Sequence, residues 1–504
     1  MNEENRQLKY GALISYLAIF INTATALLYL PWMAQKIGQS NYALYNLSYS
    51  FVSLFLSDFG LSSAAARFIA KYRAENQEEK ANILLSMITK LYTAIDLIIG
   101  AIMIVVYLFI GQIYKGLTPA ELEILKPLFL INAIYSLVSF PFMSLSGILN
   151  AYEKFIQLKL CDLGQKLTNV LLIIVSLLSG KGVIAVMACN AISGILFILI
   201  KIIIVRKETP IRLKWKLKDP ALLNSVFSFS VWTAVSSIAQ RCIFSLAPSI
   251  LGIVSNSTEI AIFSPANALE GYFYMFAAAV NGLFLARISR YIANNERDRI
   301  YTLMVKVGRY QMTVMGLIFI GFISLGKDFM IAWMGPEYER SAICAALIFL
   351  PDLLLFTEQI ASSTIIAENK VKYSAFSNIG MAVICVALSF PLSAEYGALG
   401  SCLAIAISYF VSFIYMNYIY HKVLHLDVLR FFRECYTSFI LPFALTFVIS
   451  RLLGSLIPFS GWIGLLIRIL MITMIYTLLV WTLSLKKDEK EWFLINIHKN
   501  HKEK

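Results

Sequence analysis

The chain has 504 residues, of which 59% are hydrophobic and only 14% are charged. Soluble domains carry about 25% charged residues, so this composition excludes an ordinary soluble protein and predicts a polytopic, all-α membrane protein. The formal net charge of +13 does not indicate nucleic-acid binding, because the basic residues lie on short loops between apolar segments.

About fourteen apolar segments, each long enough to cross the hydrocarbon core of a bilayer, follow one another along the chain. The first is longer than a signal-peptide core and no small-residue cleavage site follows it, so we expect an uncleaved first helix. The approximate limits of the segments are 11–33, 41–64, 83–110, 124–148, 160–179, 183–205, 223–253, 260–285, 305–325, 342–366, 373–393, 397–420, 436–456 and 462–484.

The loops between these segments predict the orientation of the chain. Lys and Arg residues concentrate in alternate loops and in the tail after residue 485. Since cytoplasmic loops carry the excess of positive charge, we expect both termini on the cytoplasmic side. The longest loop, at 206–222, combines basic residues with Trp215 and is expected to lie on the anionic inner leaflet.

The second half of the chain repeats the first at an offset of about 214 to 220 residues. Matching positions are Tyr72 and Tyr291, Asn76 and Asn295, Lys80 and Arg299, Lys90 and Arg309, Lys154 and Lys370, and Gly164 and Gly380. Because six segments per repeat is an even number, both copies have the same orientation and form two six-helix bundles related by an axis along the membrane normal. The expected domains are an N-terminal bundle (1–205), a basic linker (206–222), a C-terminal bundle (223–420), two additional transmembrane helices (421–484) and a basic cytoplasmic tail (485–504).

Four cationic residues lie inside the apolar segments, where a charge is costly and usually faces protein or water. Arg241 lies in a segment rich in Ser, Thr and Ala, which suits a polar passage at the junction of two halves. Lys90, Lys166 and Arg468 are the other three, and all four are candidates for a substrate-binding cationic cavity. The alternative is that each side chain reaches outward to the headgroups or pairs with an acid for structural reasons.

Among the acidic residues inside the segments, Asp96 is the deepest in the first half and Glu270 in the second. A carboxylate in such surroundings can exchange a proton, which makes both residues candidates for coupling to H+ or Na+. The alternative is a buried structural pair, such as Asp96 with Lys90. Asp58, near the end of the second segment, is expected to anchor a tight structural corner.

No pattern typical of an enzyme is present in the sequence. The seven cysteines are scattered and form neither a CxxC motif nor a Cys/His cluster, so we expect no metal site and no disulfide framework. There is no phosphate-cradling glycine loop and no nucleophile elbow. A polysaccharide polymerase or glycosyltransferase generally needs a sizeable extramembrane domain, and no loop here is long enough. We therefore expect a transporter without catalytic residues or a cofactor.

Several motifs resemble those of the polysaccharide and O-antigen flippases of the multidrug/oligosaccharidyl-lipid/polysaccharide exporter superfamily. Asp58-Phe59-Gly60-Leu61 followed by Ala66-Arg67 is similar to a conserved corner of that family, which makes Asp58, Gly60 and Arg67 the expected structural corner. Leu149-Asn150-Ala151 with Lys154, and Gly397-Ala398-Leu399-Gly400, are the other similar motifs. The chain departs from the family at Cys242, where such flippases often have an aspartate. It also lacks the acid of drug antiporters and the arginines of lipid II flippases in its first segment.

The resemblance implies a flippase of the bacterial inner membrane that moves an undecaprenyl-pyrophosphate-linked oligosaccharide by alternating access, for surface polysaccharide or O-antigen synthesis. Arg241, Lys166 and Lys90 would attract the pyrophosphate, and the lipid tail would stay in the bilayer against the last two segments. The implied partners are the lipid-linked oligosaccharide, membrane lipids and glycan polymerase or chain-length proteins. A cation-coupled exporter of small amphiphiles or drugs on the same fold, and a non-catalytic component of a glycan-assembly complex, remain as alternatives.

Overall fold

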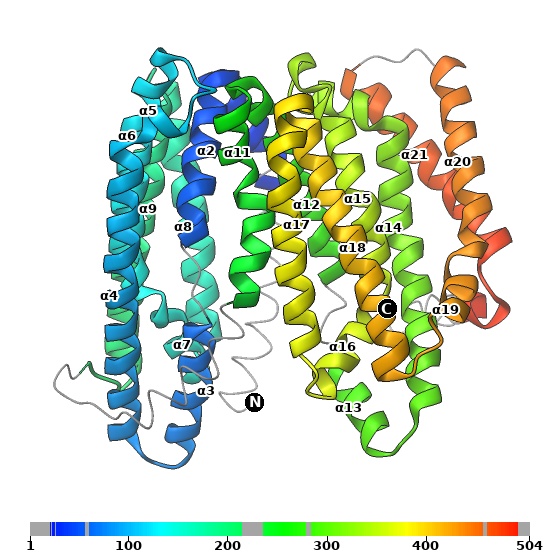
Figure 1. Cartoon of the computed structure of the whole chain (residues 1–504), viewed down its shortest axis with the longest axis horizontal. Coiled ribbons are helices and arrows are strands. Elements are labelled where there is room, and N and C mark those ends of the chain that lie inside the picture. Colours follow the sequence, from blue (N-terminus) through cyan, green and yellow to red (C-terminus); the bar gives the residue numbers. More distant parts are fainter. Residues whose placement is uncertain are drawn as a thin grey trace, which may run out of the picture. The chain divides into compact units, whose positions relative to one another are not determined.

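The computed structural model describes residues 21, 23–25, 27–55, 60–213, 235–278, 284–456 and 461–491 (Figure 1). Every regular element within these ranges is a helix, which confirms the expected all-α class. Asp58, most of the first expected segment and most of the 206–222 linker lie outside the described residues.

Packing divides the chain into two compact units. Unit 1 comprises Met1–Ser264 and Ala382–Ser401, and unit 2 comprises Pro265–Met381 and Cys402–Lys504. The division passes through three long helices: α12 (Ser257–Ala278), α17 (Lys372–Tyr396) and α18 (Ala398–Leu424). The bundle limits at 205 and 420 that we expect from the sequence remain predictions.

Unit 1 is built from antiparallel helices joined by short turns. Within it α8 packs on α9, α3 on α7, and α2 on both α6 and α11. Thr118 and Glu121 form a capping box, with Pro119 in the first turn, that starts α6. The other helices are α2 (Gln39–Phe55), α3 (Leu61–Ala74), α4 (Glu78–Leu108), α5 (Ile110–Ile113), η1 (Phe140–Phe142), α7 (Ser144–Ala151), α8 (Phe155–Leu178), α9 (Val183–Glu208) and α11 (Ala247–Val254), with α6 at Pro119–Ser139.

Unit 2 is organised around the longest helix in the described part of the chain, α14 (Arg297–Trp333), on which α15, α20 and α21 pack. The short helix α19, eight residues long, follows α18 and is strongly amphipathic. It starts at the Asp427 cap, whose carboxylate accepts a hydrogen bond from Arg430 N. The remaining helices are α13 (Leu285–Ala293), η2 (Pro336–Tyr338), α15 (Ser341–Thr357), α16 (Gln359–Ala367), α19 (Val428–Cys435), α20 (Thr437–Leu456), α21 (Gly461–Leu479) and a π-helical turn, η3 (Val480–Ser484).

Ten of the described helical stretches are long and apolar enough to cross a membrane, or eleven if a bent pair counts as one span. Many of their large apolar side chains are exposed, among them Leu97, Leu171, Ile463 and Met474. Such surfaces are stable only against lipid, so the protein is a multi-pass membrane protein. The expected count of fourteen is not confirmed, because the first segment lies largely outside the described residues and α2 has only 17 residues.

The internal repeat is visible in the turns between helices. Asn76 ends α3 and Asn295 ends α13, with φ angles of 55° and 56°. In both turns the next residue donates its N–H to a tyrosine carbonyl five residues earlier, from Gln77 to Tyr72 and from Glu296 to Tyr291, at 2.8 Å each. Asparagine is tolerated in this left-handed conformation better than most residues, so the matched asparagines fix matched helix ends.

A second pair of turns repeats in the same way. Glu153 follows α7 and Asn369 follows α16, with φ angles of 57° and 55°. The next residues, Lys154 and Lys370, donate their N–H groups to the carbonyls of Leu149 and Ile365, both at 2.9 Å. The sequence repeat therefore corresponds to a repeat of helix-turn geometry, as predicted.

Candidate functional site

Arg241 lies in the helix Val235–Ser245 of unit 1, and its side chain is exposed. Its Nη1 donates to the carbonyl oxygen of Ser53 at 2.9 Å, and the hydroxyls of Ser53 and Ser245 are 3.3 Å apart. Ser53 belongs to the last turn of α2, where carbonyl groups lack helical partners and the helix dipole favours a cation. Arg241 is therefore held at the end of α2 with its guanidinium still accessible.

A bend of 44° follows directly after this helix, between Ser245 and Ala247. Pro248 occupies the first turn of α11, where its ring removes a backbone donor and clashes with the preceding turn. The bend ends the straight stretch that carries Arg241.

Lys166 lies on α8, half-buried, one turn before Asn169 on the same helix. Asn169 donates to the side-chain oxygen of Asn190 on α9, and Asn190 Nδ2 donates to the hydroxyl of Tyr45 on α2 at 2.6 Å. Asn169 Oδ1 is buried and has no hydrogen-bond partner among the described residues. Three helices thus contribute a connected polar group, one of whose members lies one turn from Lys166 on α8.

Lys90 and Asp96 both lie on α4 and are half-buried. One Asp96 carboxylate oxygen is fully buried and lacks a hydrogen-bond partner in the described part of the chain.

The structure describes two residues of the expected corner, Gly60 and Arg67. Gly60 precedes α3 with a φ angle of 72°, a conformation that favours glycine, and Arg67 is exposed on α3. The corner brings α3 so close to α7 that a Cβ at Gly147 would lie 2.4 Å from Ser62 O.

Arg468 lies in unit 2 and is bound to an acid. Its Nη1 lies 2.7 Å from Asp328 Oδ2, so α21 is tied to α14 by an ion pair. By contrast, Arg241 and Lys166 form no ion pair with any residue that the structure describes. Of the four cationic candidates, Arg468 is therefore already neutralised by a neighbouring carboxylate.

Glu270 of α12 and Asp352 of α15 are both buried in unit 2, and their carboxyl groups interact electrostatically. The Tyr274 and Phe356 rings make an edge-to-face contact, with centroids 5.4 Å apart. Tyr274 lies one helical turn after Glu270, and Phe356 lies one turn after Asp352. Asp352 is 0% exposed, and neither of its oxygens has a hydrogen-bond partner among the described residues. Asp352 interrupts the apolar run FLPDLLLF and is one of the acids that the sequence places inside an apolar segment, but from the sequence only Asp96 and Glu270 are expected to couple ions.

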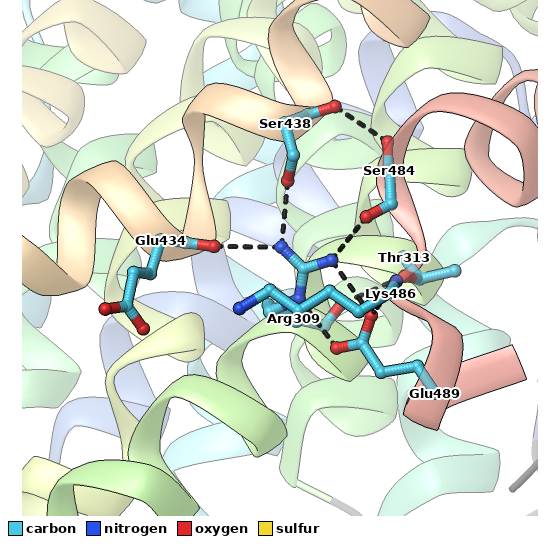
Figure 2. Close-up of polar contacts among 7 residues, drawn as sticks. All are labelled: Arg309, Thr313, Glu434, Ser438, Ser484, Lys486 and Glu489. Carbon is cyan, nitrogen blue, oxygen red and sulfur yellow. Dashed lines mark hydrogen bonds and ion pairs between the residues drawn. The ribbon is translucent and has the colours of Figure 1, made fainter.

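Arg309 is the most deeply buried cation that the structure describes, with 2% of its surface exposed. Figure 2 shows its guanidinium surrounded by Glu434, Ser438, Ser484 and Glu489. From the sequence, Arg309 is expected only as the repeat partner of Lys90. Its depth inside the long apolar α14 was the available signal.

Within the described ranges, no group of three or more His, Cys, Asp or Glu side chains could hold a metal ion.

The model of the polysaccharide biosynthesis protein family matches residues 8–284, more than half of the chain. The chain belongs to this family. No curated protein matches this polysaccharide biosynthesis protein.

Solved structures similar to this member of the polysaccharide biosynthesis family are membrane transporters. The lipid II flippase MurJ in an inward closed conformation has a TM-score of 0.69 and 18% identity, covering 93% of this chain and 98% of that one. An inward-facing multidrug resistance MATE transporter has a TM-score of 0.65 and 14% identity, covering 82% and 96%. A MOP superfamily transporter from Pyrococcus furiosus has a TM-score of 0.57 and 13% identity, covering 82% and 94%. At these low identities the comparisons show the fold alone, which the chain shares with these transporters.

Proposed function

We propose that this protein is a flippase that moves an undecaprenyl-pyrophosphate-linked oligosaccharide across the bacterial inner membrane by alternating access, for surface polysaccharide or O-antigen synthesis. In this proposal both termini lie in the cytoplasm, and the partners are membrane lipids and glycan polymerase or chain-length proteins. Membership of the polysaccharide biosynthesis family and the MOP transporter fold support a flippase of this class.

The observation that carries the proposal is the accessible guanidinium of Arg241, which forms no ion pair with any residue that the structure describes. A guanidinium binds a phosphate through two parallel hydrogen bonds, and one such contact with a charged group contributes about 1.5–3 kcal/mol. Lys166 supplies a second cation without an acidic partner among the described residues of unit 1. In this proposal Arg241 and Lys166 attract the pyrophosphate and Lys90 assists them, whereas Arg468 serves mainly to join α21 to α14.

Polar and aromatic side chains of unit 1 suit the oligosaccharide. The connected group of Asn169, Asn190 and Tyr45 offers amides and a hydroxyl to sugar hydroxyls. The Tyr49 ring stacks on Tyr45 with centroids 6.4 Å apart and is exposed, so it presents an apolar face to a sugar ring.

The test compares Arg241→Ala and Arg241→Lys with wild type, at matched expression, in a strain whose surface glycan depends on this gene. We expect Arg241→Ala to reduce glycan display about tenfold or more, because each 1.4 kcal/mol of lost binding is a factor of ten. Arg241→Lys should restore part of the display, since it keeps the charge but loses the planar fork. Lys181→Ala, which removes an exposed loop charge, is the control. Full display with both Arg241 variants would remove Arg241 from the mechanism.

Asp96 and Glu270 are the proposed ion-coupling residues, and the structure adds Asp352 as a neighbour of Glu270. An isolated buried carboxylate is costly when ionised, so binding H+ or Na+ would relieve that cost. Transport coupled in this way would link ion movement to the alternation between states.

The fold shared with MATE transporters supports one alternative, a cation-coupled exporter of small amphiphiles. A deletion strain separates the two functions, because a flippase mutant loses surface polysaccharide, whereas an exporter mutant becomes sensitive to drugs. A non-catalytic role in a glycan-assembly complex predicts instead that purified protein in vesicles moves no lipid-linked sugar.

A further inference from the structure

A cavity of about 520 Å³ lies in unit 2 where α19, α20 and the turn after α21 meet. Four basic side chains and one acidic side chain line it: Arg309, Arg430, Arg433, Lys486 and Glu434. Thr437, Ser438 and Ser484 supply the remaining lining. None of these residues belongs to the substrate site proposed in unit 1.

The four basic groups of the cavity interact with two carboxylates, Glu434 and Glu489, so positive charge remains in excess. Arg309 is bound by Glu489, and Arg430 Nε lies 2.6 Å from Glu434 Oε1. Arg433 and Lys486 are both exposed. Arg433 has no acidic partner among the described residues, and the only carboxylate there that interacts with the Lys486 charge is Glu489, which already binds Arg309. The cavity therefore carries an excess of positive charge that nothing in the described part of the chain neutralises.

The Arg309 network holds these groups around the cavity (Figure 2). Arg309 Nη1 donates to Glu434 O and Ser438 Oγ, which fixes α19 and the start of α20. Its Nη2 donates to Ser484 O, and Glu489 accepts from Arg309 and from Lys486 N at 2.8 Å. Lys486 thereby lines the same cavity as Arg430 and Arg433, which lie one turn apart on α19.

The neighbouring surface indicates where the ligand comes from. Leu429 on α19 is 82% exposed, directly before Arg430. An amphipathic helix with exposed apolar and basic residues lies at a membrane interface, with its basic groups at the level of the lipid phosphates.

We propose that this cavity binds the phosphate of an anionic ligand, with Arg433 and Lys486 as the principal contacts and Arg430 assisting. The ligand class is a phosphate-bearing headgroup at the membrane surface. A membrane phospholipid and a soluble diphosphate share this chemistry, and the experiment distinguishes the two. The inference does not depend on the proposed flippase activity, because it concerns a separate site and is measured as binding.

The test uses the full-length protein purified in a neutral detergent, with binding followed by native mass spectrometry. The probes are short-chain phosphatidylglycerol, short-chain phosphatidylcholine and inorganic pyrophosphate. We expect wild type to prefer phosphatidylglycerol to phosphatidylcholine, and the double variant Arg433→Gln/Lys486→Gln to bind it at least about tenfold more weakly. Lys372→Gln, which removes an exposed charge elsewhere in unit 2, should bind like wild type.

Pyrophosphate binding without phosphatidylglycerol binding, lost in the double variant, would support the site and assign it to a soluble diphosphate. Unchanged binding of both anions in the double variant would overturn the proposal, as would wild type that binds phosphatidylglycerol and binds phosphatidylcholine just as tightly. If the double variant unfolds, the single variant Arg433→Gln and a salt titration of wild type replace it. Binding that is insensitive to salt in wild type would then contradict a site based on charge.

Discussion

Arg309 shows how a single buried charge is accommodated in unit 2. All five N–H donors of its guanidinium are used, two on Nη1, two on Nη2 and one on Nε. Its carboxylate partner, Glu489, is nearly as deeply buried, with 9% of its side chain exposed. Removing one member of such a pair leaves the other charge without compensation, which costs more than the pair itself contributes.

Replacing Arg309 tests this account at the level of one residue. We expect Arg309→Met to lower the free energy of unfolding by about 3–5 kcal/mol, measured as a lower melting temperature of the purified protein. Arg451→Met, at an exposed position of α20, should change stability by less than about 1 kcal/mol. Equal melting temperatures for the two variants would contradict a structural role for the Arg309 network.

The Glu489 carboxyl gives the network a pH dependence. Burial by itself would raise the pKa of Glu489, but hydrogen bonds from Arg309 and Lys486 N outweigh it and hold the pKa below the ordinary value of 4.5. A group whose pKa is lower in the folded state stabilises that state above its unfolded pKa. The contribution is lost as the pH falls through the folded pKa.

We therefore expect the melting temperature of wild type to decrease as the pH falls below about 4.5, and Glu489→Gln to show a smaller decrease. A thermal unfolding series over acidic and neutral pH measures both proteins. Parallel curves for wild type and Glu489→Gln would show that another group controls acid stability.

At the scale of helices and turns, the repeat is specified by local chemistry. Asn76 and Asn295 hold the same left-handed conformation and the same pattern of backbone hydrogen bonds, although the helices around them differ in sequence. A β-branched residue in that conformation is strained by about 1–3 kcal/mol, whereas glycine is not.

Substitution at these turns should give matched effects in the two halves. We expect Asn76→Val and Asn295→Val each to lower the melting temperature, and Asn76→Gly and Asn295→Gly to remain close to wild type. Differential scanning fluorimetry of the four purified variants checks this. A valine variant as stable as its glycine counterpart would argue against the turn as a determinant of helix ends.

At the scale of the whole molecule, the cations and the acids that our proposal uses are divided between the two units. Arg241 and Lys166 belong to unit 1 together with Asp96, whereas the neighbouring acids Glu270 and Asp352 belong to unit 2. A transporter with separate sites for substrate and ion requires a conformational change that both ligands bias. The buried carboxyls are then expected to control coupling rather than substrate affinity.

Asp352→Asn tests that division. If Asp352 takes part in ion coupling, the variant should be expressed normally, bind the lipid-linked oligosaccharide like wild type, and flip it in vesicles without dependence on a pH or Na+ gradient. Asp298→Asn, which changes an exposed acid at the start of α14, should keep the wild-type dependence. Unaltered gradient dependence in Asp352→Asn would exclude this residue from coupling.

The sequence by itself determined the membrane class, the all-α fold, the approximate positions of most helices and the internal repeat. Each of these depends on local composition or on a short pattern that recurs along the chain, such as an apolar segment or an asparagine at a helix end. The sequence also identified Arg241, Lys166 and Glu270 as unusual, because a charge inside an apolar segment is visible without a structure.

Only the tertiary structure decided which of these charges are paired and which are not. Arg309 meets Glu489 across 180 residues, Arg468 meets Asp328 across 140, and Asn190 meets Tyr45 across 145. Contacts between such distant residues depend on how the helices pack and leave no periodic signal in the chain. The interaction of Asp352 with Glu270 and the basic cavity at α19 also depend on how separate helices pack, so the sequence does not predict them.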